Sequence, residues 1–199
     1  GRRELNMFRK ILIANRGEIA VAIIRACRDM GIRSVAVYSE ADKDALHVHL
    51  ADEAICIGPA DSQNSYLNCQ AIISAAIVTG ADAIHPGFGF LSENVSLVRL
   101  CEQCHIKFIG ATSETMALMG DKNQARKSAV AAGVPVIPGS SSLITDLGEA
   151  RQTAQAIGYP VIIKAASGGG GRGMRIVYQE NDLSHAYMAA RAEAKAAFG

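Results

Sequence analysis

The sequence lacks the features of a nucleic-acid-binding or membrane-spanning protein. Its 199 residues carry 20 basic and 19 acidic side chains, which leaves a net charge of only +1. No strong field therefore attracts the chain to nucleic acid or to an anionic lipid surface. No stretch approaches the about 18 apolar residues that a spanning helix needs, and the first residues contain no apolar segment typical of a signal peptide. We expect neither nucleic acid nor a membrane as a partner.

The chain also lacks a cysteine pattern that indicates disulfides or a metal. Its five cysteines are scattered and odd in number, which indicates reduced thiols and a cytoplasmic setting. Cys101, Cys104 and His105 match the string that attaches c-type haem, but attachment needs an exported chain, and no second cysteine pair is present for zinc. His47 and His49 are two residues apart and do not share a helix face, so we predict no metal pair there.

Short apolar runs alternate with helical periodicities along the first two thirds of the chain, and 49% of all residues are hydrophobic. This alternation predicts an α/β fold with a Rossmann-like parallel sheet as the N-terminal domain. Ligands of such sheets bind beyond the carboxyl ends of the strands. The expected strands are 11–14, 34–38, 54–57, 83–86 and 107–110, and the expected helices run from 17 to about 30, 66–78, 92–104, 113–119 and 121–132.

A stretch rich in Gly, Pro and Ser, residues 133–142, is the best candidate for a domain boundary. Beyond it we expect a helix at 146–157, strands at 159–165 and 174–178, and a helix at 181–197. A pair of strands is marginally stable alone, so this α+β unit is predicted to be incomplete. The predicted division is an N-terminal domain at 7–120, a helical linker at 121–138 and a truncated lid at 139–199.

A run of glycines between the last two expected strands carries the strongest chemical signal. Ordering such a run costs much backbone entropy, and close approach of backbone N–H groups to phosphate oxygens is a good reason for it. The loop leads into a strand, unlike a dinucleotide fingerprint, and therefore resembles the loop that covers ATP in kinases. Met174 stands where a Walker A loop needs lysine, so the loop is not of that type. The alternative interpretation of the glycines is a flexible linker. The glycines are Gly168, Gly169, Gly170 and Gly171.

Two lysines can supply the positive charge that a polyphosphate needs. Lys164 ends the apolar strand in front of the glycine loop, where burial of its charge is costly without an anion. The alternative is a strand-end lysine that reaches water. Lys122 follows Asp121, a candidate helix N-cap, and by itself reads as a surface lysine.

Three turns remain open to a structural or a functional interpretation. Residues 15–18 follow the first strand and precede a helix N-terminus, so they can bind an anion or form a structural turn. Glu40 and Asp42 follow the second strand, and without a glycine fingerprint we predict a solvated turn there. His85 precedes Pro86 and is expected to be a structural turn histidine rather than a substrate contact.

Five strings in order resemble the biotin carboxylases of the ATP-grasp superfamily, and the resemblance covers residues 7–199. In that family ATP phosphorylates bicarbonate to carboxyphosphate, whose CO2 passes to N1 of biotin on a carrier protein. The strings are KILIANRGEIA at 10–20, HPGFGFLSEN at 85–94, MGDK at 119–122, YPVIIKAA at 159–166 with the glycine loop, and RAEAKAAF at 191–198.

The resemblance implies roles for particular residues. Lys122 and Lys164 would contact the ATP phosphates or base, the glycine loop from Gly168 to Gly171 would cover the phosphates, and Met174 would line the adenine side. Phe88, where the family often has Tyr, and Gly89 would face the biotin and bicarbonate pocket. The family's magnesium ligands, bicarbonate-binding arginine and general base come from a C-terminal region that these residues do not include. We therefore expect no catalytic residue here and no carboxylation by the chain alone.

The resemblance also implies partners and leaves alternatives open. Expected partners are a biotin carboxyl carrier protein, a carboxyltransferase component and a second copy of the complete subunit. The whole would serve acetyl-CoA carboxylase in fatty acid synthesis, or a related biotin-dependent carboxylase. The alternatives are another ATP-grasp ligase, such as a carbamoyl-phosphate synthetase large chain, and a docking module without activity.

Overall fold

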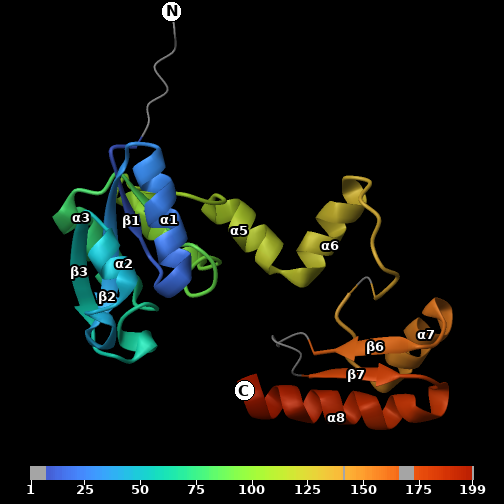
Figure 1. Cartoon of the computed structure of the whole chain (residues 1–199). Coiled ribbons are helices and arrows are strands. Elements are labelled where there is room, and N and C mark those ends of the chain that lie inside the picture. Colours follow the sequence, from blue (N-terminus) through green and yellow to red (C-terminus); the bar gives the residue numbers. More distant parts are fainter. Residues whose placement is uncertain (1–7, 141, 166–172, 199) are drawn as a thin grey trace, which may run out of the picture. The chain divides into compact units, whose positions relative to one another are not determined.

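The computed structural model describes residues 8–140, 142–165 and 173–198, and the side chains of these up to Glu193. The chain divides into two compact units, Gly1–Asp121 and Lys122–Gly199, which are described separately (Figure 1). The elements of the first unit are β1 (Lys10–Ile13), α1 (Gly17–Asp29), β2 (Arg33–Ser39), η1 (Glu40–Asp42), α2 (Leu46–Leu50), β3 (Glu53–Gly58), η2 (Ser62–Asn64), α3 (Cys69–Thr79), β4 (Ala83–His85), α4 (Val95–Gln103), β5 (Lys107–Phe108) and α5 (Ser113–Gly120). Those of the second are α6 (Lys122–Ala131), α7 (Leu147–Ile157), β6 (Val161–Lys164), β7 (Met174–Val177) and α8 (Glu180–Phe198).

The first unit is built on a five-stranded sheet in the order β3-β2-β1-β4-β5, and every neighbouring pair is parallel. This confirms the predicted α/β class. β1 is the central strand. β2 and then β3 follow on one side of it, and β4 and then β5 follow on the other side. The chain thus changes direction between β1 and β4, and in open α/β sheets ligands bind at such a point, beyond the carboxyl ends of the strands.

Helices cover both faces of this sheet (Figure 1). Alternate residues of β1 point to opposite faces, as strand geometry requires. Ile11 and Ile13 pack with the buried side chains of α1, whereas Leu12 packs with those of α3 and α4. β1 is apolar throughout its buried length because both of its faces are covered.

Side-chain caps set the first residues of two helices. The Asn68 side chain accepts from the Ala71 N–H at 3.1 Å, and α3 begins at Cys69; the Asn94 side chain accepts from the Leu97 N–H at 3.0 Å, and α4 begins at Val95. The predicted starts at residues 66 and 92 were therefore three residues too early. Asparagine is a preferred N-cap because its oxygen satisfies a free amide of the first turn.

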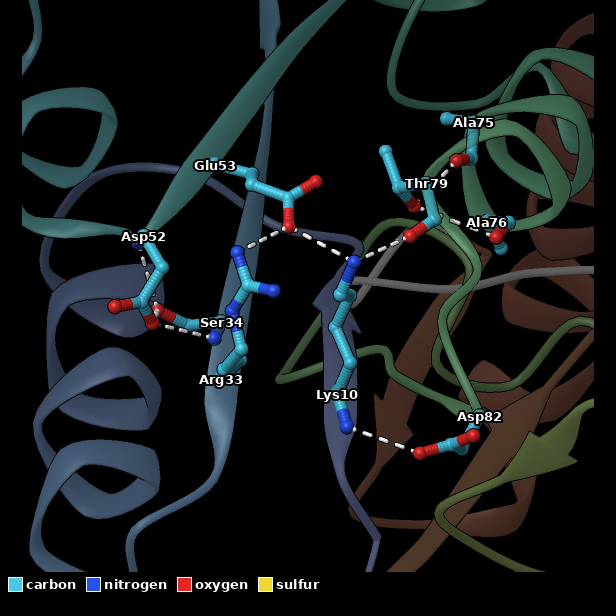
Figure 2. Close-up of polar contacts among 9 residues, drawn as sticks. All are labelled: Lys10, Arg33, Ser34, Asp52, Glu53, Ala75, Ala76, Thr79 and Asp82. Carbon is cyan, nitrogen blue, oxygen red and sulfur yellow. Dashed lines mark hydrogen bonds and ion pairs between the residues drawn. The ribbon is translucent and has the colours of Figure 1, made fainter.

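Charged side chains join three strands at the amino end of the sheet (Figure 2). One carboxylate oxygen of Glu53 contacts both Lys10 Nζ and Arg33 Nη2 at 2.8 Å, and Lys10 Nζ also donates to the Thr79 carbonyl at 2.6 Å. The Asp82 carboxylate accepts from the backbone N–H of Lys10 at 3.0 Å. These contacts lie at the end opposite to the ligand-binding edge, so we assign them to stability.

In the second unit two helices cover one face of an antiparallel hairpin. β6 pairs with β7, and α7 and α8 pack on the same side of it around Val177 and Leu183. α7 begins with a reciprocal cap: Asp146 accepts from the Glu149 N–H at 2.9 Å, and Glu149 accepts from the Thr145 N–H at 3.1 Å. No helix within the described residues has the length and apolar character to cross a membrane.

The contacts at the amino end predict that Lys10 and Arg33, which share the Glu53 carboxylate, contribute unequally to the free energy of unfolding. The Lys10 side chain is 17% exposed and that of Arg33 is 59% exposed. Lys10→Met should lower the free energy of unfolding by about 2 kcal/mol, since it removes buried hydrogen bonds to a charged group. Arg33→Met should cost less than about 1 kcal/mol, as is usual for an exposed ion pair. Urea unfolding followed by circular dichroism measures both, and an equal cost for the two variants would contradict the interpretation.

Candidate functional site

A pocket lies at the carboxyl ends of β1 and β4, where the direction of the sheet changes. It is formed by the turn after β1 and by the loop after β4, which are far apart in sequence but neighbours in space because their strands pair. The predicted substrate residues Phe88 and Gly89 both line it, and Phe88 is 80% exposed. The lining residues are Asn15, Arg16, Gly17, Glu18, Ile19, Phe88, Gly89 and Phe90.

The side chain of Asn15 fastens the two walls of this pocket together. Asn15 is buried, and its Nδ2 donates to the carbonyls of Pro86 and Phe88, both at 2.8 Å. Its Oδ1 accepts from the Arg16 N–H at 2.9 Å. Gly87 sits so close that a Cβ atom on it would lie 2.8 Å from Asn15 Nδ2, and its φ is +64°, so only glycine fits there. The turn at 15–18 is thus a structural part of the pocket wall.

The structure corrects the expectation that Glu40 and Asp42 lie in a solvated turn. Glu40 is exposed, but Asp42 is buried and not part of a solvated turn. Its two carboxylate oxygens accept from Arg16 Nε and Nη2, both at 2.6 Å, and one of them also accepts from the Tyr66 hydroxyl. A buried carboxylate needs such partners, since burial otherwise disfavours the charge. The Arg16 hydrogen bonds in particular lower the pKa of Asp42 to about 2, and the same contacts raise the pKa of Arg16.

Two histidines near this edge have structural roles. His85 Nδ1 accepts from the Gly87 N–H at 3.0 Å, so this ring shapes the turn after β4, and burial lowers its pKa. His47 is buried, with Nε2 3.1 Å from the Val37 carbonyl, and burial lowers its pKa as well. Among the described residues no group of three or more His, Cys, Asp or Glu side chains is placed to hold an ion.

The second unit presents two predicted nucleotide residues on one exposed face. Lys164, the last residue of β6, pairs directly with Met174, the first residue of β7. Directly opposite residues of paired strands lie on the same face. Lys164 is exposed, and Met174, Ile162 and Ile176 are exposed on the same face. This face combines a cation with an apolar surface, which fits the phosphates and the base of a nucleotide.

The structure says less about the other residues that are predicted to bind the nucleotide. Lys122 is the first residue of α6 and is exposed. Gly168, Gly169, Gly170 and Gly171 lie outside the described residues. The roles of all of these residues, and of Phe88 and Gly89, stay predictions. In the haem-like string Cys101 is buried and Cys104 is exposed.

Sequence reasoning missed the contribution of Tyr66. It placed this residue inside a helix, whereas Tyr66 precedes α3, is 3% exposed and stacks on Phe90 at a centroid distance of 5.1 Å. No local pattern identifies such a residue, because its partners Asp42 and Phe90 are 24 residues away on either side.

Family models match both units. Residues 121–199 match the "Carbamoyl-phosphate synthase L chain, ATP binding domain", and residues 7–116 match the "Biotin carboxylase, N-terminal domain". The fold and the match of residues 121–199 define the class of the chain, an α/β protein with an ATP-binding domain. The match of residues 7–116 covers more than half of the chain. The chain therefore belongs to the biotin carboxylase family.

Similar proteins agree with this assignment and exceed the chain in length. Biotin carboxylase 1 of Bacillus subtilis is 55% identical over 193 residues, which cover 97% of this chain and 43% of the relative. The chloroplastic biotin carboxylase of Arabidopsis thaliana is 53% identical, with 96% and 35% covered. A solved biotin carboxylase–β-γ-ATP complex from Campylobacter jejuni has a TM-score of 0.90 at 55% identity, with 97% and 43% covered. The chain thus corresponds to an N-terminal part that spans less than half of these relatives.

The contacts of Asp42 predict a specific dependence of stability on pH. Its pKa is about 2 in the folded chain and 3.8 ordinarily, so the carboxylate stabilises the fold fully above about pH 4 and loses this effect as the pH falls toward 2. Asp42→Asn should lower the free energy of unfolding at pH 7 by about 2 kcal/mol and flatten its decline between pH 4 and 2. Urea unfolding at a series of pH values measures this. Glu40→Gln is the matched control, and an unchanged slope in Asp42→Asn would refute the assignment.

Proposed function

We propose that this chain forms the N-terminal domain and most of the ATP-covering lid of a biotin carboxylase, which uses ATP and bicarbonate to carboxylate biotin on a carrier protein. The single observation that carries the proposal is the coincidence of two features. A pocket bearing Phe88 and Gly89 lies at the switch point of the sheet, and the hairpin that frames the glycine loop presents Lys164 and Met174 on one open face.

The residues of the hairpin fit a nucleotide by their chemistry. An ammonium group such as that of Lys164 attracts phosphate oxygens, and the attraction grows when the ligand excludes water. Met174 offers a polarisable apolar contact for a flat base. We propose that Lys122 and the glycines 168–171 contact the same nucleotide, and that residues 121–138 join the two domains. Bound Mg2+ would neutralise charge on the phosphates, with ligands from a region that this chain does not include.

We propose that Phe88 and Gly89 face the biotin and bicarbonate. An exposed aromatic ring beside a backbone with a glycine φ of +73° offers an apolar platform and close access to main-chain groups. The biotin carboxylase domain of a 2-oxoglutarate carboxylase from Hydrogenobacter thermophilus, with a TM-score of 0.87 and 49% identity, was solved as a dimer with MgADP, ADP and bicarbonate.

The proposed assembly extends to the partners of the family. We infer a carrier protein that bears biotin, a carboxyltransferase component that receives the carboxyl group, and a homodimer of the complete subunit. Acetyl-CoA carboxylase in cytoplasmic fatty acid synthesis is the assembly we favour, with other biotin-dependent carboxylases as alternatives. The relatives include both bacterial and chloroplastic biotin carboxylases.

The first prediction of this proposal concerns catalytic competence. A chimera in which this chain replaces the matching N-terminal part of Bacillus subtilis biotin carboxylase 1 should hydrolyse ATP in a manner that depends on bicarbonate and free biotin. The 199-residue chain alone should show no such turnover, since positioning without the metal site does little for phosphoryl transfer. A folded, dimeric chimera without turnover would refute the proposal, and so would turnover by the isolated chain.

The second prediction concerns nucleotide affinity. Lys164→Met should weaken ADP binding to the chain by about tenfold, which corresponds to the loss of one partly screened charge contact. Isothermal titration calorimetry measures the change. Lys127→Met removes a different exposed lysine of the same unit and should leave the affinity within about twofold. Equal effects of the two variants would mean that only the net charge matters.

A further inference from the structure

The pocket loop 87–90 has a backbone that its own sequence does not favour. Gly87 and Gly89 have φ values of +64° and +73°, which glycine adopts readily, but Phe90 also has a positive φ, +41°. Non-glycine residues adopt this region rarely and at an energetic cost, so the surrounding structure must hold Phe90 there. The Asn15 side chain holds the first half of the loop, at the carbonyls of Pro86 and Phe88.

Tyr66 contacts the second half of the loop. Its ring stacks on that of Phe90 with a centroid distance of 5.1 Å and an interplanar angle of 21°. The Tyr66 side chain is itself fixed, because its hydroxyl donates to Asp42 and accepts from the Ser39 N–H at 3.0 Å. Asp42 is fixed in turn by Arg16, which belongs to the opposite wall of the pocket.

We propose that Tyr66 is a positioning residue for the carboxylase substrate that meets Phe88 and Gly89. Tyr66 does not line the pocket. It selects the conformation of the loop through Phe90, and the loop then presents Phe88 and Gly89 to the ligand. The proposal rests on the proposed function for the identity of that ligand, biotin, and it adds to that function a residue whose ring acts on the loop through Phe90.

The physical consequence is a selective effect on substrate affinity. If the ring of Tyr66 is lost, Phe90 is free to relax to a negative φ, and only a fraction of molecules keeps the loop ready for binding. The apparent affinity falls in proportion to the fraction of molecules that is ready for binding. One aromatic pair corresponds to a factor between about 2 and about 10 in this equilibrium. Lys164 and Met174, which we propose to contact the nucleotide, belong to the other unit, so we expect little change in nucleotide affinity.

The test uses three single variants and one double variant of the Bacillus chimera, with steady-state kinetics and free biotin. Tyr66→Leu should raise the KM for biotin by about 2- to 10-fold and change the KM for ATP by less than about twofold. Tyr66→Phe keeps the ring and loses the hydroxyl, so it should unfold at lower urea and yet keep the KM for biotin. Phe90→Leu should act like Tyr66→Leu, and the double variant should add nothing further. A merely structural Tyr66 would give Tyr66→Phe and Tyr66→Leu the same kinetics, and that result would overturn the proposal.

A second measurement on the 199-residue chain does not depend on activity. The Ser92 N–H donates to the Gly89 carbonyl at 2.9 Å, so its hydrogen exchange reports on the loop. Tyr66→Leu should speed this exchange by about 2- to 10-fold, while the Ala14 N–H, which donates to the His85 carbonyl at 2.9 Å, should exchange as before. Unchanged exchange at Ser92 would refute the inference by itself. An inactive chimera with the expected exchange would instead refute the proposed function and leave the positioning of the loop established.

Discussion

The carboxyl edge of the first unit depends on the charge of one buried carboxylate. Asp42 is largely buried, and burial disfavours its charge unless strong donors surround it. Arg16 and Tyr66 supply them from the turn after β1 and from the segment before α3. One anion thus ties together three segments that are distant in sequence, and two of them bear on the pocket, Arg16 directly and Tyr66 through Phe90. The pocket is shaped by the requirement that this charge be satisfied.

The strand order explains why the pocket and the ion pairs of Glu53 lie at opposite ends of the same sheet. With β1 in the centre and its neighbours on both sides, the loops after β1 and β4 meet at one end and leave an opening. At the other end Lys10, Glu53 and Arg33 close the sheet with ion pairs. Changes at the amino end alter the free energy of unfolding, whereas changes at the carboxyl end also alter the shape of the pocket.

Much of this fold was predictable from the sequence, because its signals are local. An apolar run such as residues 11–14 identifies a buried strand, and Gly31 marks the end of α1 at the expected place. The features that the sequence did not reveal depend on distant partners: the burial of Asp42 and the contacts of Tyr66. The segment around Asp42 is polar and reads as solvated until its ion pair with Arg16, 26 residues earlier, is known. Within the site, Phe88 and Gly89 came from resemblance, and the structure adds that they line one pocket.

The second unit shows why a hairpin with two helices can be ordered while one of its faces stays open. α7 and α8 bury Val177 and Leu183 and supply the apolar contacts that an isolated pair of strands lacks. The other face keeps Ile162, Met174 and Ile176 exposed around Lys164. Exposed apolar patches of this kind often mark a surface that binds a ligand or another part of a protein. This open face is the one on which we propose that a nucleotide binds, because a flat base can cover apolar side chains and phosphates attract an ammonium group.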